Sequence, residues 1–268
     1  MGSSAEEQLI EAIRRYFRED LGRCLENEEL TSRLGGKKYR EFLDLSGVPF
    51  DDKKVLDIGS GFGEALMAIE QKGAISYGIE LDKDRVSLSV QFLKEKGLNA
   101  SIVRSAAEHL PFGDEQFDIV HMRDVIEHVN SPKAALREAS RVLKTGGHLL
   151  MTCPNYLYPY EGHYRIFFIP FTPKKLAKCY LRILKKPVHY IEDVNYITYI
   201  WLKLTLKKEL HIKIIDNPFE KQKISEPVLI KSKFRRNTVR IVKRIGILSR
   251  NISYFSPNIS IVGIKFQD

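Results

Sequence analysis

Three closely spaced glycines form the most chemically suggestive stretch of the chain. Gly59, Gly61 and Gly63 follow a short apolar run, with one residue between each pair. Glycine tolerates a left-handed backbone and carries no side chain, so it suits a sharp turn or a close approach of backbone to ligand. The spacing G-x-G-x-G differs from the G-x-G-x-x-G of dinucleotide sites, but its demand on the backbone is similar. The glycine spacing therefore predicts a strand, a sharp turn and then a helix, with a ligand close to the backbone of the turn.

An acidic residue follows the glycines at the distance that is typical of nucleoside-binding sites. Glu80 lies about 20 residues after the glycines, at the tip of the next expected strand. A carboxylate at this position can accept hydrogen bonds from both ribose hydroxyls and would repel a 2′-phosphate. The glycines alone are weak evidence, whereas strand, glycine turn, helix, strand and acidic tip in this order are strong evidence for such a site.

Alternating strands and helices must position these residues. Apolar runs indicate buried parallel strands at residues 54–59, 75–81, 100–105, 117–124 and 148–154, with helical patterns between them, the last at 131–147. Residues 210–218 and 258–266 are expected to add two more strands. The alternation predicts an α/β fold with a Rossmann-like, doubly wound, mostly parallel seven-stranded sheet.

Less regular segments flank this core. We expect an N-terminal helical segment at residues 1–46, a cofactor-binding core at 47–155, and a C-terminal part at 156–268. The C-terminal part is expected to contain an acceptor-side insertion between strands five and six, about 156–208, and the completion of the sheet. A long loop is expected first, then helices at 173–185, 196–208 and, strongly basic, 234–250. No internal repeat interrupts the chain, so one elaborated domain is favoured over two.

Several motifs in register resemble the class I S-adenosylmethionine-dependent methyltransferases, particularly the small-molecule branch similar to ubiquinone-biosynthesis and sugar methyltransferases. "VLDIGSGFG" is similar to the first motif of that family and "GIELD" to the second. "SAAEHLPFGDEQFDIV" resembles the segment that covers the adenine, and "RDVIEHVNSPKAALREASRVLKTGGHLLMTCPN" the fourth strand through the fifth. The resemblance covers residues 39–155 densely and "SPNISIVGIKF" loosely. It implies an enzyme that uses S-adenosyl-L-methionine as its cofactor.

The resemblance also assigns a cofactor site. It would comprise Asp57, Gly59, Ser60, Gly61, Gly63, Glu80, Leu81, Ala106, Ala107, Glu108, Arg123 and Asp124. Asp57 would orient the glycine loop near the cofactor amino group, Glu80 would hold the ribose, and Leu81 would lie against the adenine.

Two parts of this site depart from the family pattern or stay open. Many relatives have an acidic residue where this chain has Ala106, so the Ala107 backbone or Glu108 is expected to contact the adenine amine instead. Arg123 would line the site through its backbone. Asp124 either faces the cofactor or acceptor or caps the next helix.

Methyl transfer to a hydroxyl also needs a group that takes up its proton. The candidates are Glu127 and His128, just after strand four, and His163, after strand five, because ligands bind at the carboxyl edge of such sheets. Glu127 and His128 could equally cap and pack the following helix, and His163 could pack within its aromatic loop. His121, inside a strand pattern, is expected to be a core residue. No cluster shows convincing metal-ligand spacing, so we expect no metal site.

The charge is strongly divided along the chain. Residues 1–150 hold 21 of the 43 Lys and Arg and 26 of the 34 Asp and Glu, so their net charge is −5 and that of residues 151–268 is +14. The insertion interleaves aromatic residues with lysines. Such a surface can dock on anionic lipid, stack on nucleic-acid bases, or serve as an ordinary lid with solvated lysines.

Three functions are therefore weighed. The leading one is O-methylation of a small-molecule, glycan or lipid-linked acceptor, including quinone types, with an anionic membrane surface as a further partner. An RNA methyltransferase that uses the basic half is the second; no "NPPY"-type motif follows strand four, which counts against base N-methylation. A non-catalytic S-adenosylmethionine-binding protein is the third. Three cysteines without paired spacing, no secretory signal and no membrane-spanning run favour a cytoplasmic protein, at most peripheral at the membrane.

Overall fold

A seven-stranded sheet organises the protein. The computed structural model describes residues 4–19, 30, 34–161, 163–164, 166–216 and 258–267. The strands follow the order β3-β2-β1-β4-β5-β9-β8, and β9 runs antiparallel to both of its neighbours. Their bounds are β1 Lys54–Ile58, β2 Ile75–Glu80, β3 Ser101–Arg104, β4 Phe117–Arg123, β5 Leu143–Pro154, β8 Ile212–Asp216 and β9 Asn258–Lys265. The expected Rossmann-like, mostly parallel sheet is confirmed.

Helices cover both faces of the sheet because successive strand residues point to opposite sides. Leu56 belongs to a core formed with α6 (Pro132–Val142) and α9 (Tyr199–Glu209). Its neighbour Val55 belongs to a core on the other face, formed with α3 (Lys37–Ser46) and α4 (Glu64–Glu70). Both strand residues are fully buried, which explains the continuous apolar runs of the sequence.

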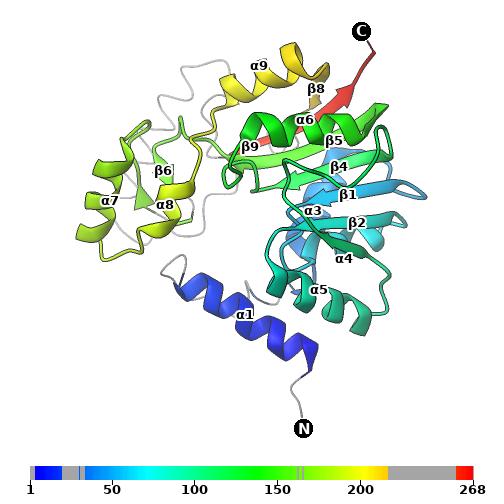
Figure 1. Cartoon of the computed structure of the whole chain (residues 1–268), viewed down its shortest axis with the longest axis horizontal. Helices are drawn as coiled ribbons and strands as arrows, with labels where there is room; N and C mark the ends of the chain where they lie inside the picture. Colours follow the sequence, from blue (N-terminus) through cyan, green and yellow to red (C-terminus); the bar gives the residue numbers. More distant parts are fainter. Residues whose placement is uncertain are drawn as a thin grey trace.

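The insertion forms a lobe beyond the carboxyl ends of the parallel strands (Figure 1). It holds the hairpin β6 (Tyr160–Glu161) and β7 (Ile166–Phe167) and the helices α7 (Lys174–Ile183) and α8 (His189–Asp193). Several of its aromatic side chains share a buried cluster with apolar residues of α1 (Ala5–Glu19), which packs on α5 (Lys83–Glu95). The lobe and α1 thus meet at the edge of the sheet where a ligand is expected.

Some boundaries differ from the expected ones. The helix expected at 131–147 ends at Val142, because Leu143 is extended and pairs with Phe117 of β4. A register shift at this point lets the next residues bulge before regular pairing resumes at His148. The long loop expected after strand five contains the short β6–β7 hairpin. The basic helix expected at 234–250 falls outside the described residues. Over the part of the chain that is described, no helix has the length and apolarity to cross a bilayer.

Candidate functional site

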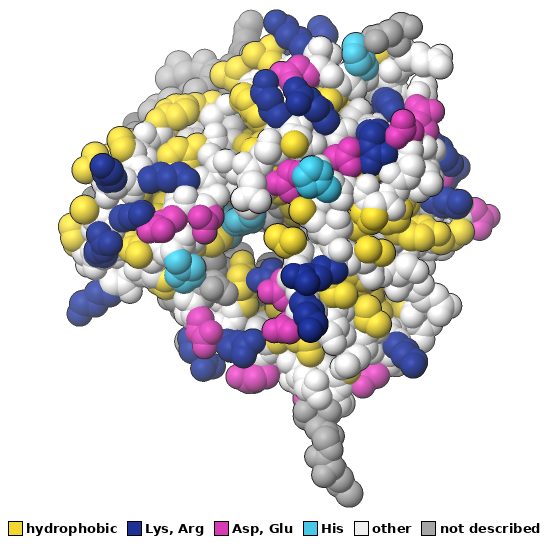
Figure 2. All heavy atoms as spheres, viewed as in Figure 1, with side chains coloured by type: hydrophobic (Ala, Val, Ile, Leu, Met, Phe, Trp, Pro, Cys, Tyr) yellow, Lys and Arg dark blue, Asp and Glu magenta, His cyan; other side chains and the backbone are white. Residues whose placement is uncertain are grey.

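A cavity of about 440 Å³ opens between the carboxyl edge of the sheet, α1 and the insertion lobe. Figure 2 shows a hollow between the lobe and the sheet side of the molecule. Nine of the expected site residues line the cavity: Gly59, Gly61, Glu80, Leu81, Ala106, Ala107, Glu108, Asp124 and His128. Residues from strands far apart in the sequence therefore meet around one space, as expected for the switch point of a doubly wound sheet.

The glycine loop brings bare backbone to the cavity wall. The amides of Gly59 and Ser60 both donate to the carbonyl oxygen of Ile79, at 2.7 and 2.8 Å, which ties the loop to β2. Gly59 has a φ of 73°, and a Cβ there would lie 2.3 Å from Cγ2 of Val125. Neither the backbone conformation nor the space accepts a side chain. The observed geometry fits the close approach that the sequence predicts.

Glu80 is held rigidly at the cavity wall. Its Oε2 accepts a hydrogen bond from the amide of Gly61, and its Oε1 accepts one from the amide of Asp82, each at 2.9 Å. The side chain is largely buried. Each carboxylate oxygen has a further lone pair, so a fixed acceptor pair remains for two ribose hydroxyls. These features fit a nucleoside.

The next part of the wall suits an adenine ring. Leu81 lines the cavity and is 60% exposed, so its apolar side chain is available to a ligand. Ala106 and Ala107 also line the cavity and add little side-chain bulk. Glu108 also reaches the cavity, and its Oε1 accepts a hydrogen bond from the amide of Ser131 at 3.1 Å.

Other expected residues support the site from behind. Asp57 lies opposite His121 in the β1–β4 register, and its Oδ1 is 2.6 Å from Nδ1 of His121 in the buried interior. Asp57 is thus directed at a neighbouring strand and is not among the cavity-lining residues. His121 is a core residue, as expected. Ser60 is buried, Gly63 precedes α4 with a φ of 83°, and the Arg123 guanidinium lies 4.5 Å from the centre of the Tyr39 ring. Their roles toward the cofactor stay predictions.

The turn after β4 builds the other end of the cavity. Asp124 has a φ of 54°, uncommon for a residue with a side chain, and its amide donates to the Thr152 carbonyl oxygen at 2.9 Å. This conformation turns the chain so that Asp124 and His128 both line the cavity, while Glu127 points into the protein. Strained backbone of this kind concentrates at functional sites.

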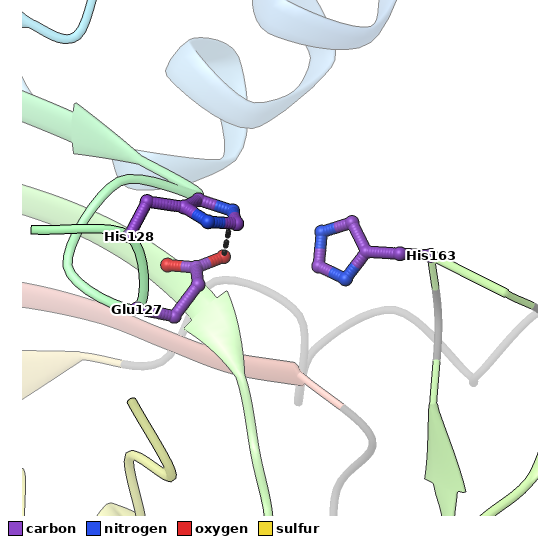
Figure 3. A group of neighbouring side chains, drawn as sticks. All are labelled: Glu127, His128 and His163. Atoms are coloured by element: carbon purple, nitrogen blue, oxygen red, sulfur yellow. Dashed lines mark ion pairs between the residues drawn. The ribbon is translucent and has the colours of Figure 1, made fainter. Parts of the chain in front are cut away.

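Glu127, His128 and His163 form one cluster (Figure 3). Oε1 of Glu127 lies 3.7 Å from Nε2 of His128, and the His163 ring faces them from the insertion. Burial raises the pKa of Glu127, and the charge of Asp124 raises it further. Burial and the neighbouring His163 lower the pKa of His128 to about 4, although a third of its side chain stays exposed. His128 is therefore neutral at physiological pH.

Two further residues orient the cluster. Nδ1 of His163 lies 2.7 Å from Oε1 of Glu161, whose Oε2 accepts a hydrogen bond from the amide of Tyr164 at 2.6 Å. The Tyr190 hydroxyl lies 3.1 Å from Nε2 of His128, and the His163 and Tyr190 ring centres are 4.6 Å apart. The insertion thus fixes both imidazoles.

Sequence reasoning missed several cavity residues outside the familiar motifs. They are Tyr16 of α1, Arg85 of α5, and His189, Tyr190 and Asp193 of α8. The Arg85 guanidinium lies 4.8 Å from the centre of the Tyr16 ring, which joins α1 to the cavity wall. The sequence showed Tyr16 only as part of a helical apolar face. The α8 residues lie in the insertion, whose path no local pattern specifies.

Comparisons with known proteins identify the central part of the chain. Residues 56–151 match a family described as "Methyltransferase domain". An uncharacterized methyltransferase of Bacillus subtilis is 36% identical over 101 residues, which are 37% of this chain and 40% of the relative. A ubiquinone biosynthesis O-methyltransferase of Aliivibrio fischeri is 31% identical over 104 residues, 38% of this chain and 44% of the relative. The chain therefore spans less than half the length of these relatives.

Two further similarities extend the comparison. A sarcosine/dimethylglycine N-methyltransferase of Halorhodospira halochloris is 27% identical over 173 residues, 58% of this chain and 62% of the relative. The crystal structure of the Bacillus subtilis protein covers 86% of this chain and 100% of its own, with a TM-score of 0.53 and 20% identity, and so supports the fold alone. Fold, cofactor-side geometry and family match agree: the chain carries a class I S-adenosylmethionine-dependent methyltransferase domain at residues 56–151.

Proposed function

We propose that the whole protein is a methyltransferase that modifies a small acceptor at the carboxyl edge of its sheet. The proposal rests on one observation: the same cavity is lined by residues that suit a nucleoside and by residues next to the insertion. Glu80 and Leu81 lie in the part that suits a nucleoside, and His128 and Tyr190 lie in the part next to the insertion. S-adenosylmethionine, when bound, supplies an activated methyl group.

The residues of this chain would align and shield the reacting groups. Glu80 and the Gly61 backbone would hold the ribose, and Leu81 would cover the adenine. At the other end, His128 lines the cavity with a neutral imidazole that can accept a hydrogen bond from the acceptor. α1 and α8 contribute to the wall and exclude water from one side.

An oxygen acceptor is favoured by the proton-accepting cluster, because a hydroxyl must lose its proton during attack. The name of the Aliivibrio relative includes O-methyltransferase, whereas that of the Halorhodospira relative includes N-methyltransferase. A hydroxyl of a quinone-type, glycan or lipid-linked molecule is therefore our first candidate, and an amine is the second.

Incubation with methyl-labelled S-adenosylmethionine and fractionated cell extract tests this proposal. We expect label in a lipid or glycan fraction. His128→Ala should lower the turnover number by roughly 10²–10⁴-fold, the usual contribution of an acid–base group, with unchanged affinity for S-adenosylhomocysteine. His148→Gln, in β5, is the matched control and should retain turnover. Label in no fraction, with tight cofactor binding, would favour the non-catalytic alternative.

The lipid-linked acceptor is supported by the outer surface of the lobe. Four apolar side chains there are largely exposed, Ile169, Phe171, Leu176 and Ile183, the last at 78%. Leu176 and Ile183 lie on α7, which also holds Lys174, Lys175 and Arg182 (Figure 2 shows basic and apolar side chains together on the lobe). Apolar side chains surrounded by cations suit an anionic bilayer surface. Other aromatic residues of the insertion, such as Tyr164 and Phe168, are buried and form its core.

Co-sedimentation with vesicles tests the lipid-binding surface independently of methyl transfer. We expect binding to phosphatidylserine-containing vesicles and loss of binding in a Leu176→Asp/Ile183→Asp variant. Ile75→Asp, at an exposed apolar position of β2, is the control. Equal binding of all three proteins would refute the lipid surface. Transfer of label to total RNA would instead support the RNA methyltransferase alternative.

A further inference from the structure

Three ligand-type side chains converge next to the cavity, and one of them, His128, lines it. Glu127 and His128 belong to the turn after β4, and His163 belongs to the turn of the β6–β7 hairpin. One potential ligand atom from each lies within 4.8 Å of the other two. Figure 3 shows the His163 ring facing the other two side chains across a small gap. Small side-chain rotations would bring all three within bonding distance of one ion.

The described surroundings of the Glu127 carboxylate do not stabilise its negative charge. Both of its oxygens are fully buried and accept no hydrogen bond from the described residues. A buried carboxylate without partners is costly, and such groups are normally paired or coordinate a metal. The charges of Asp124 and Glu161 also act on Glu127, so the surroundings add negative potential. A cation between Glu127 and the two imidazoles would relieve this cost.

His163 is already oriented as metal-bound histidines usually are. Its Nδ1 is engaged with Oε1 of Glu161 at 2.7 Å, which leaves Nε2 available for another contact. The amide of Tyr164 holds the second oxygen of Glu161. A carboxylate behind the histidine fixes its orientation and increases the basicity of the other nitrogen. This support is independent of the unpaired Glu127 carboxylate.

We propose that Glu127, His128 and His163 bind a divalent transition-metal ion such as Zn²⁺. Two imidazoles and one carboxylate suit Zn²⁺ or Co²⁺ better than Mg²⁺ or Ca²⁺, which prefer oxygen ligands. Nε2 of His128, which lies 3.1 Å from the Tyr190 hydroxyl, would be the ligand atom of this residue. The spacing in the sequence did not predict this site, because its third ligand comes from the insertion 35 residues away.

The site rests on the proposed function and changes one role in it: Nε2 of His128 would bind the ion instead of accepting the hydrogen bond of the acceptor. Three protein ligands leave an open coordination position, as in catalytic zinc sites, and His128 places it at the cavity. Such an ion would supply Lewis-acid chemistry that lowers the pKa of an acceptor hydroxyl. Asp124 lines the cavity with a half-exposed side chain and would pass the released proton to solvent. An acceptor that offers an oxygen to a metal is therefore the preferred substrate class.

Metal binding to the full chain tests the proposal without any acceptor. After dialysis against a chelator, the protein is titrated with Co²⁺, monitored by its visible absorption, and with Zn²⁺ in competition. We expect one equivalent to bind, Mg²⁺ not to compete, and His163→Ala to abolish the Co²⁺ spectrum. Glu161→Gln should weaken binding by about 10–100-fold, as for other residues that orient a ligand. His148→Gln should bind like wild type.

The outcomes separate this inference from the proposed function. Equal Co²⁺ affinity in wild type and His163→Ala, or no preference over Mg²⁺, overturns the metal site. Because Glu127→Gln alters a buried position and can impair folding, His163→Ala and Glu161→Gln carry the test. S-adenosylhomocysteine affinity is measured on the same samples. Methyl transfer by chelator-treated protein would refute the metal site alone, whereas metal binding without cofactor binding would refute the proposed function.

Discussion

Replacement of Glu80 by glutamine should separate the structural role of this carboxylate from its role toward the ribose. In the native protein each oxygen accepts one backbone hydrogen bond, from Gly61 and from Asp82. The side-chain amide of glutamine has one oxygen and one NH₂ group. One of the two backbone amides would therefore face the NH₂ group, which is also a donor and cannot accept its hydrogen bond. An unpaired buried amide costs about 1–3 kcal/mol, and the remaining bond loses the benefit of charge. We expect Glu80→Gln to lower the free energy of unfolding by about 2–4 kcal/mol.

The same substitution should weaken ribose binding. A hydrogen bond to a charged group contributes about 1.5–3 kcal/mol, which corresponds to roughly 10- to 150-fold in the dissociation constant. Titration calorimetry with S-adenosylhomocysteine measures this change, at a temperature where circular dichroism shows the variant to be folded.

Glu70→Gln provides a matched control. Glu70 also accepts two hydrogen bonds, from Ser76 Oγ at 2.9 Å and from the Asn99 amide at 3.1 Å, but it does not line the cavity. It should lose stability and keep full cofactor affinity. A folded Glu80→Gln protein with the affinity of wild type would refute the ribose assignment.

Two further predictions follow from the same region and from the core. Gly59→Ala should destabilise the fold by at least about 1–2 kcal/mol, which is the cost of a left-handed alanine. It should also abolish cofactor binding, because the new Cβ would collide with Val125. Urea unfolding and titration calorimetry measure the two effects, and an unchanged urea midpoint would contradict the first. Burial raises the pKa of the Cys153 thiol, whereas Cys179 is exposed. A Cys24→Ser protein should therefore react with one equivalent of Ellman's reagent when native and with two when denatured. A second fast-reacting thiol in the native protein would show that Cys153 is accessible.

The cofactor half was largely predictable because its signals are local. The glycine loop, Glu80 and the apolar strands lie in the expected elements, and each depends on contacts between neighbouring segments. Asp57 shows the limit of this reasoning: the family resemblance suggested a role near the cofactor, which stays a prediction, whereas cross-strand register adds a contact with His121 that no local pattern indicated. Strand pairing is a long-range property that spacing alone does not reveal.

The acceptor half was less predictable for the same reason. His128 and His163 were identified as candidates, but their convergence depends on how the hairpin packs against the turn after β4. Tyr16 and Tyr190 reach the cavity from elements far apart in the sequence. The helical pattern around Tyr16 indicates a buried face but not which other element that face meets, and no local pattern predicted the short helix that holds Tyr190.

The two ends of the cavity also differ in how they can change. The end that we propose for the nucleoside is lined by residues between 59 and 108, whereas the turn after β4 and α8 line the end next to the insertion. The family match at residues 56–151 stops before the insertion begins. On the proposed function, exchange of the insertion would therefore change the end of the cavity that meets the acceptor and leave the glycine loop and Glu80 in place.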